Sequence, residues 1–155
     1  MIILKFALAL FTAIFVHEGG HAVMVKASGG DVTNFRPYPT EWHLGYVSWT
    51  AVEKRYLPSI NMGGIIASNA SIPISSYFIR KYPDEEYFRF WRQIAVWDFP
   101  AHCIMSFWQK DNDISQFCSN TEIPKSVMLG LSLIYLRFNK NMIFSDGKIL
   151  FKIEI

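Results

Sequence analysis

The chain has 155 residues, of which 51% are hydrophobic, 16% aromatic and 18% charged. This length suits one domain and leaves little room for a second. The net charge of +2, spread over scattered basic and acidic residues, argues against a nucleic-acid partner. The two cysteines, Cys103 and Cys118, are too few for a disulfide framework and form no Cys-x-x-Cys pair, which argues against a thiolate zinc site.

The first predicted element is an apolar helix over residues 2–25, interrupted by a polar pentad at residues 17–21. A helix of this length could cross a bilayer, because a crossing needs about 20 residues. A secretory signal peptide is the alternative interpretation, with Lys5 as its basic region and residues 6–16 as its apolar core. The apolar sequence continues past the pentad without a clear small-residue cleavage site, which favours the spanning helix.

A short β-hairpin is predicted to follow this helix. Gly29 and Gly30 end the helix, since glycine accepts the left-handed turn that follows a helix C-terminus. Residues 31–52 then combine strand-forming and turn residues, and residues 43–50 are rich in β-formers that partly alternate. The segment therefore predicts a hairpin or an edge strand.

Three further apolar segments are predicted to be helices, at residues 60–79, 87–108 and 127–136. The first of them contains many small residues and no charge, a composition that lets helices approach closely in a membrane. Residues 109–122 are rich in polar side chains and are predicted to be a connection between the last two helices.

The predicted fold class is mainly α. It is a small multi-helix membrane bundle of about four helices, with a short β-hairpin after the first helix and a C-terminal β tail. The tail is residues 142–155, where Asp146-Gly147 is a favoured hairpin turn pair. Residues 1–155 are expected to form a single membrane-embedded domain.

The pentad His17-Glu18-Gly19-Gly20-His21 carries the clearest chemical signal. Two histidines four apart on a helix lie on one face, so their imidazoles can converge on one zinc ion at about 2.0–2.1 Å. The glutamate beside the first histidine can reach the open coordination position, where zinc lowers the pKa of water to roughly 7. The pattern predicts that His17 and His21 are metal ligands and that Glu18 is the general base.

The position of the pentad supports this interpretation. Histidine and glutamate are costly to bury in an apolar helix unless they have partners, and a bound cation supplies one. A catalytic zinc usually has three protein ligands, so a third must come from elsewhere in the chain. The candidates are His43, Asp98, His102, Asp111, Asp113 and Asp146. Asp98 and His102, four apart, are also candidates for orienting a ligand from the second shell or for a polar pair between helices.

These features together resemble the site-2-protease family of intramembrane zinc metalloproteases, over residues 1 to about 138. The pentad lies inside an apolar first helix, as in that family, and the strand-like segment 32–52 follows it. The small-residue helix at residues 63–69 is similar to the family's G-P-x-x-N helix. Asp113 and the turn at residues 121–124 (T-E-I-P) are similar to the compact branch, where an aspartate precedes a T-x-I-P-like turn.

This resemblance implies that Asp113 is the third metal ligand and that Asn69 orients the substrate. Gly64 stands where the family has its proline, and Asn69 lies one residue farther along than the family spacing. Asp146-Gly147 resembles the family's other form of the third ligand, and Asp111 remains an alternative carboxylate.

The activity implied by the resemblance is that of a zinc-dependent endopeptidase with one Zn²⁺ per chain. Its expected substrates are membrane-associated or transmembrane protein segments, and its expected setting is that of an integral, multi-pass membrane protein in contact with lipid. Two alternatives stay open. One is a non-catalytic membrane scaffold of the same fold, and the other is a soluble zinc peptidase with a cleaved or buried N-terminus.

Overall fold

The computed structural model describes residues 1–39 and 44–143, and within them the chain is mainly helical. The elements in chain order are α1 (Ile2–Ala27), β1 (Asp31–Arg36), β2 (Tyr46–Thr50), a short 3-10 turn (Lys54–Tyr56), α2 (Leu57–Lys81), α3 (Glu86–Met105), α4 (Asp113–Thr121) and α5 (Lys125–Ile143). The predicted mainly α fold with a hairpin after the first helix is therefore confirmed. The predicted C-terminal hairpin lies outside the described residues.

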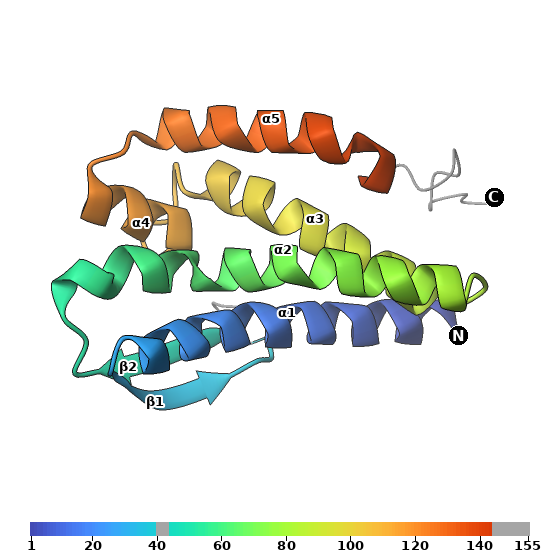
Figure 1. Ribbon diagram of the computed structural model, residues 1–155, viewed down its shortest axis with the longest axis horizontal. Helices are drawn as coiled ribbons and strands as arrows, with labels where there is room; N and C mark the ends of the chain where they lie inside the picture. Colours follow the sequence, from blue (N-terminus) through green and yellow to red (C-terminus); the bar gives the residue numbers. More distant parts are fainter. Residues whose placement is uncertain (40–43, 144–155) are drawn as a thin grey trace.

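The β-hairpin follows α1 directly and packs back on it (Figure 1). Gly29 ends the helix with a positive φ of 77°, the left-handed conformation that glycine adopts at little steric cost. Strands β1 and β2 pair antiparallel, with a register irregularity between Val32 and Asn34. The hairpin thereby covers the C-terminal half of α1, where the pentad lies.

The helices α1 and α2 run antiparallel and side by side, and α3 lies between α2 and α5 (Figure 1). Glycines bring α1 and α2 together: a Cβ added to Gly63 would lie only 2.8 Å from the carbonyl oxygen of Gly20, and a Cβ on Gly20 would overlap the Gly63 backbone. Glycines facing each other in this way let two backbones approach within contact distance. The small-residue composition noted in the sequence therefore serves close packing of these two helices.

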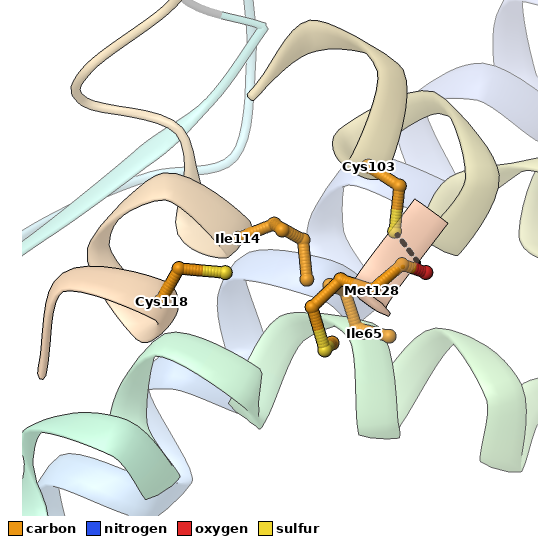
Figure 2. Close-up of a cluster of buried hydrophobic side chains, with 5 residues drawn as sticks. All are labelled: Ile65, Cys103, Ile114, Cys118 and Met128. Atoms are coloured by element: carbon orange, nitrogen blue, oxygen red, sulfur yellow. Dashed lines mark hydrogen bonds between the residues drawn. The ribbon is translucent and has the colours of Figure 1, made fainter. Parts of the chain in front are cut away.

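The predicted polar connection at residues 109–122 is wrong, because it contains the helix α4. The side-chain oxygen of Asn112 caps this helix by accepting a hydrogen bond from the backbone N–H of Ile114 at 3.0 Å. On its inner face, Ile114 and Cys118 join a buried apolar cluster (Figure 2). Most residues of this short amphipathic helix are polar, so the sequence did not indicate a helix there. The bundle therefore has five helices among the described residues instead of the predicted four or so.

The cluster in Figure 2 fixes where α4 sits. Its members are Ile65 of α2, Cys103 of α3, Ile114 and Cys118 of α4, and Met128 of α5. The thiol of Cys103 also donates a hydrogen bond to the backbone carbonyl of Met128, at 3.4 Å. Apolar burial from four helices at one point holds the N-terminus of α4 in place, and the residues there reach the pentad.

Among the helices of the described segments, α1 alone is both long and apolar enough to cross a membrane. Its most apolar 18-residue window has a mean hydropathy of 1.7, and only 28% of that window is buried. The expectation of a multi-pass protein is not supported, because no other helix in residues 1–39 and 44–143 meets both conditions.

Candidate metal centre

The two histidines of the pentad lie on one face of α1, with their ring centroids 4.9 Å apart. Their Nε2 atoms are 3.1 Å from each other. Both residues are buried, His17 at 7% exposure and His21 at 6%. The predicted convergence of the two imidazoles, which follows from the spacing of four residues, is therefore present in the structure.

The other ring nitrogens determine which atoms of these histidines carry lone pairs. Nδ1 of His17 lies 2.9 Å from Oδ2 of Asp98, and Nδ1 of His21 lies 2.6 Å from the carbonyl oxygen of Ile60. A carbonyl or an ionised carboxylate only accepts hydrogen bonds, so each Nδ1 carries the proton and donates it. In the neutral rings both Nε2 atoms are then lone-pair donors toward the space between them. Metal-bound histidines show this same pattern of second-nitrogen partners.

Asp113, the first residue of α4, brings a carboxylate into that space. Its Oδ2 lies 2.9 Å from Nε2 of His17 and 3.2 Å from Nε2 of His21. Burial raises the pKa of the Asp113 carboxyl, but the His17 and His21 rings outweigh it and hold that pKa well below its ordinary value, an effect that requires a proton on Nε2 wherever no cation lies between these atoms. The Asp113 side chain is therefore an anion that faces two ring nitrogens.

These three atoms fit a single cation. Ligands at about 2.0–2.1 Å in a tetrahedral arrangement are roughly 3.3 Å from each other. The observed separations between the two Nε2 atoms and Oδ2 of Asp113 are 2.9, 3.1 and 3.2 Å. Three acceptor atoms at such distances repel one another unless a proton or a metal ion lies between them.

A fourth side chain, His102 of α3, also reaches this group. The donor atoms of His17, His102 and Asp113 lie within 4.8 Å of one another and could hold a metal ion. The Nδ1 atom of His102 is 3.3 Å from Oδ2 of Asp113, and its ring stacks on that of His17. The site thus offers two overlapping sets of three donors, and the separations in the set with His21 are all 3.2 Å or less.

Asp98 supports the site from α3. Besides the hydrogen bond from His17, its carboxylate interacts with the side chain of Ser68 on α2 and faces Nε2 of His102 at 3.7 Å. An anion that accepts the Nδ1 proton of a metal-binding histidine orients the ring and strengthens it as a ligand. Asp98 therefore lies where it can orient the ring of His17, one of the three roles that the sequence left open for it.

Glu18 lies beside these donors in a cleft of about 780 Å³. The residue is buried, with 7% of its surface exposed, and a Cβ on Gly45 would come within 2.9 Å of its Oε1 atom. Gly45, the residue before β2, therefore lies directly against the side chain of the glutamate. The cleft is also lined by apolar side chains of this segment, including Leu44, Tyr46 and Trp49.

The remaining candidates from the sequence do not contact the group formed by His17, His21 and Asp113 in the described part of the chain. The side chain of Asn69 donates to the carbonyl of Ile65 in its own helix and does not line the cleft. Asp111 lines the same cleft, but its carboxylate makes no hydrogen bond or ion pair within the described segments. His43 and Asp146 lie outside the described residues.

Three features of the site were missed in the sequence. Gly64 lies against the ring of His17, Asn61 lines the cleft with a buried side-chain nitrogen that has no partner in the described part of the chain, and Asn112 caps α4 beside His102. The cap had a readable signal, since an asparagine followed by an aspartate and an amphipathic stretch is typical of a helix start. The other two depend on how α1 and α2 pack, for which a single sequence has no local signal.

The Gly64 contact leads to a test. A Cβ at this position would come within 2.6 Å of two ring carbons of His17, so Gly64→Ala must displace that ring. We expect the variant to bind zinc about 10–100-fold more weakly, as when a partner that orients a ligand is lost. Competition with a chromogenic chelator measures this affinity.

The matched control is Gly19→Ala, which changes the same residue type within the pentad itself. A Cβ at Gly19 meets nothing within 4 Å. We expect this variant to keep its zinc affinity and to gain up to about 1 kcal/mol of stability from the better helix former. Equal zinc affinities in the two variants would contradict the contact between Gly64 and His17.

Comparisons of the chain with protein-family models, with curated proteins and with solved structures returned no match. The functional interpretation therefore depends on the geometry described above.

Proposed function

We propose that this protein is a zinc-dependent endopeptidase in which His17, His21 and Asp113 hold the metal and Glu18 is the general base. One observation carries the proposal. The Nε2 atoms of both histidines and Oδ2 of Asp113 converge within 3.2 Å, while each histidine donates its other nitrogen to a fixed acceptor. This arrangement gathers lone pairs that need a proton or a cation between them, and one bound cation would satisfy all three atoms at once.

The donor set favours zinc over the other common divalent ions. Two imidazole nitrogens and one carboxylate are ligands typical of catalytic zinc, whereas magnesium and calcium prefer sites made of oxygen atoms. Zinc held there supplies a Lewis acid that polarises a peptide carbonyl and acidifies water. The residues of the chain add the orientation: Asp98 and the Ile60 carbonyl hold the two rings so that both Nε2 atoms face the same point.

Glu18 supplies the proton transfers of peptide hydrolysis. The peptide bond is cleaved when water adds to its carbonyl carbon and the C–N bond breaks. The carboxylate takes the proton that the water loses and delivers it to the leaving amine, so it returns to its starting state. Its carboxylate lies beneath Gly45, in the cleft that His17, His21 and Asp113 also line.

The lining of the cleft supports an apolar, extended peptide as the substrate. Side chains before and within β2 form one wall, and Leu44, Tyr46 and Trp49 make it largely apolar. Asn61 contributes a buried amide nitrogen without a partner among the described residues, and such a donor gains a hydrogen bond when a substrate carbonyl reaches it. A helix hides its peptide bonds in internal hydrogen bonds, so the substrate must unwind at the site.

We also propose that the chain is held in a membrane through α1. Large apolar side chains on this helix remain exposed, among them Ile3, Leu4, Leu8, Phe11, Phe15 and Val23. With a rise of about 1.5 Å per residue, His17 lies roughly 22 Å from the start of the helix. In a hydrocarbon core of about 30 Å, the metal centre would lie toward one face of the bilayer, where water can enter.

Extraction tests the membrane proposal. We expect the protein to stay in the membrane pellet after washing with alkaline carbonate and to be released by detergent, because an apolar helix that crosses the bilayer is not removed by pH or salt. Release by carbonate alone would support the alternative of a soluble zinc peptidase.

Metal removal tests the enzymatic proposal. We expect purified protein to contain one zinc per chain and to cleave an apolar peptide reporter, and we expect a chelator to abolish cleavage until zinc is returned. Metal content and cleavage are measured on the same samples, so that the loss and return of activity can be compared with the loss and return of zinc. Protein that contains no zinc, or that cleaves equally well without it, would contradict the proposal.

A non-catalytic metal centre is the second candidate. It is favoured by Nδ1 of His102, which at 3.3 Å from Oδ2 of Asp113 is close enough to serve as a fourth ligand. Structural zinc sites are closed by four protein side chains, whereas catalytic sites keep one position open. The two functions therefore differ in whether His102 binds the metal.

A further inference from the structure

The coordination state of the proposed zinc site depends on what Nδ1 of His102 contacts. A neutral imidazole nitrogen without a proton has one lone pair, which either accepts a hydrogen bond or binds a metal. At 3.3 Å from Oδ2 of Asp113, this nitrogen lies at the spacing expected between two ligands of one tetrahedral zinc ion, which is about 3.3 Å. It therefore lies one ligand spacing from Asp113, and it belongs with His17 and Asp113 to a group whose donor atoms are within 4.8 Å of one another.

Asn112 occupies this lone pair. The side-chain oxygen of Asn112 accepts the backbone N–H of Ile114 at 3.0 Å, as the cap of α4, so the amide nitrogen must point the other way. That nitrogen lies 3.1 Å from Nδ1 of His102 and donates to it. The cap thus determines which way the Asn112 amide points. Because Nδ1 of His102 accepts a hydrogen bond from this amide, the ring proton is on Nε2, which faces Oδ1 of Asp98.

We propose that Asn112 is a positioning residue that keeps the fourth coordination position of the metal open by holding Nδ1 of His102 in a hydrogen bond. This inference rests on the proposed zinc site formed by His17, His21 and Asp113. On this inference, the buried Asn112 determines whether the metal keeps an open position, as in a catalytic centre, or has four protein ligands, as in a structural one. The same residue caps the helix that begins with Asp113, so a single side chain positions one ligand and restrains another.

The test uses Asn112→Ser, because serine retains the cap of α4 and lacks the amide donor. The full-length protein is loaded with cobalt, whose visible spectrum reports its ligands, and is titrated with acetohydroxamate, which binds a metal through an open position. We expect the spectrum of the unmodified protein to change on titration. In Asn112→Ser we expect the response to be lost and peptidase activity to fall about 100-fold, because His102 occupies the position that water needs.

His102→Phe supplies the matched control, since phenylalanine preserves the ring that stacks on His17 and has no nitrogen. We expect this variant to keep the acetohydroxamate response, and we expect Asn112→Ser combined with His102→Phe to regain it. Regain in the double variant shows that His102, and not a disturbed α4, closed the site.

Two results would overturn the inference while leaving the zinc site intact. In one, cobalt-loaded Asn112→Ser still responds as the unmodified protein does. In the other, the unmodified protein does not respond and His102→Phe does, which would make His102 a resident ligand. Protein that takes up no cobalt at all would overturn the proposed function, and this inference with it.

Discussion

Replacing Glu18 by glutamine is expected to lower peptidase activity by about 10²–10⁴-fold, the usual contribution of a general base, while the zinc content stays at one per chain. Glutamine has the same shape and fits the buried position beneath Gly45, but it cannot accept a proton from water. Cleavage of an apolar peptide reporter and metal analysis of the same preparation measure both quantities.

Glu53→Gln is the matched control for this variant. Glu53 is exposed, pairs with Arg55 and does not line the cleft, so the same chemical change there should leave activity unaltered. A Glu18→Gln protein as active as the control would remove the catalytic assignment. A Glu18→Gln protein without zinc would show instead that the glutamate helps to hold the metal.

Replacing Asp113 by asparagine is expected to have the largest effect on metal binding. Loss of a partner that merely orients a ligand costs about 10–100-fold in affinity, so we expect loss of the ligand itself to cost more than about 100-fold. The amide neither neutralises the cation nor matches the carboxylate as a donor to zinc. Chelator competition gives the affinity, and peptidase activity should disappear in parallel.

Asp111→Asn provides a stringent comparison, because the two aspartates are two positions apart and the sequence left both open as ligands. The Asp111 carboxylate makes no hydrogen bond or ion pair among residues 1–39 and 44–143, whereas Asp113 contacts three histidine rings. We expect Asp111→Asn to keep its zinc and its activity. The reverse order of effects would place the third ligand at Asp111.

Much of the fold could be predicted because its signals are local. The apolar first helix, its end at Gly29 and the hairpin behind it each follow from residues close together in the chain. The helix α4 was mistaken for a connection, since its single apolar face of Ile114, Phe117 and Cys118 is interrupted by polar residues that point outward. Short amphipathic helices acquire most of their stability from packing, and the sequence alone does not show the partner surface.

The candidate site, like the fold, has a part that follows from local spacing in the sequence and a part that depends on contacts between distant residues. The spacing of His17 and His21 already placed both rings on one face of a helix, and Glu18 came with them. The choice of Asp113 came from a resemblance, because the distance along the chain from residue 21 to residue 113 has no geometric meaning until the chain folds. The contact of Gly64 with His17 and the hydrogen bond from Asn112 to His102 had no equivalent in the sequence analysis.

The sequence by itself determined the apolar helix α1 and the three candidate side chains that one helical turn brings together, since both depend on a fixed local period. The tertiary structure decided which carboxylate faces those histidines, which groups accept their Nδ1 protons and which side chain holds His102. Each of those contacts joins residues of different helices, so it depends on how the helices pack against one another. Burial of apolar side chains at the junction of α2, α3, α4 and α5 determines that packing and places Asp113 opposite the pentad.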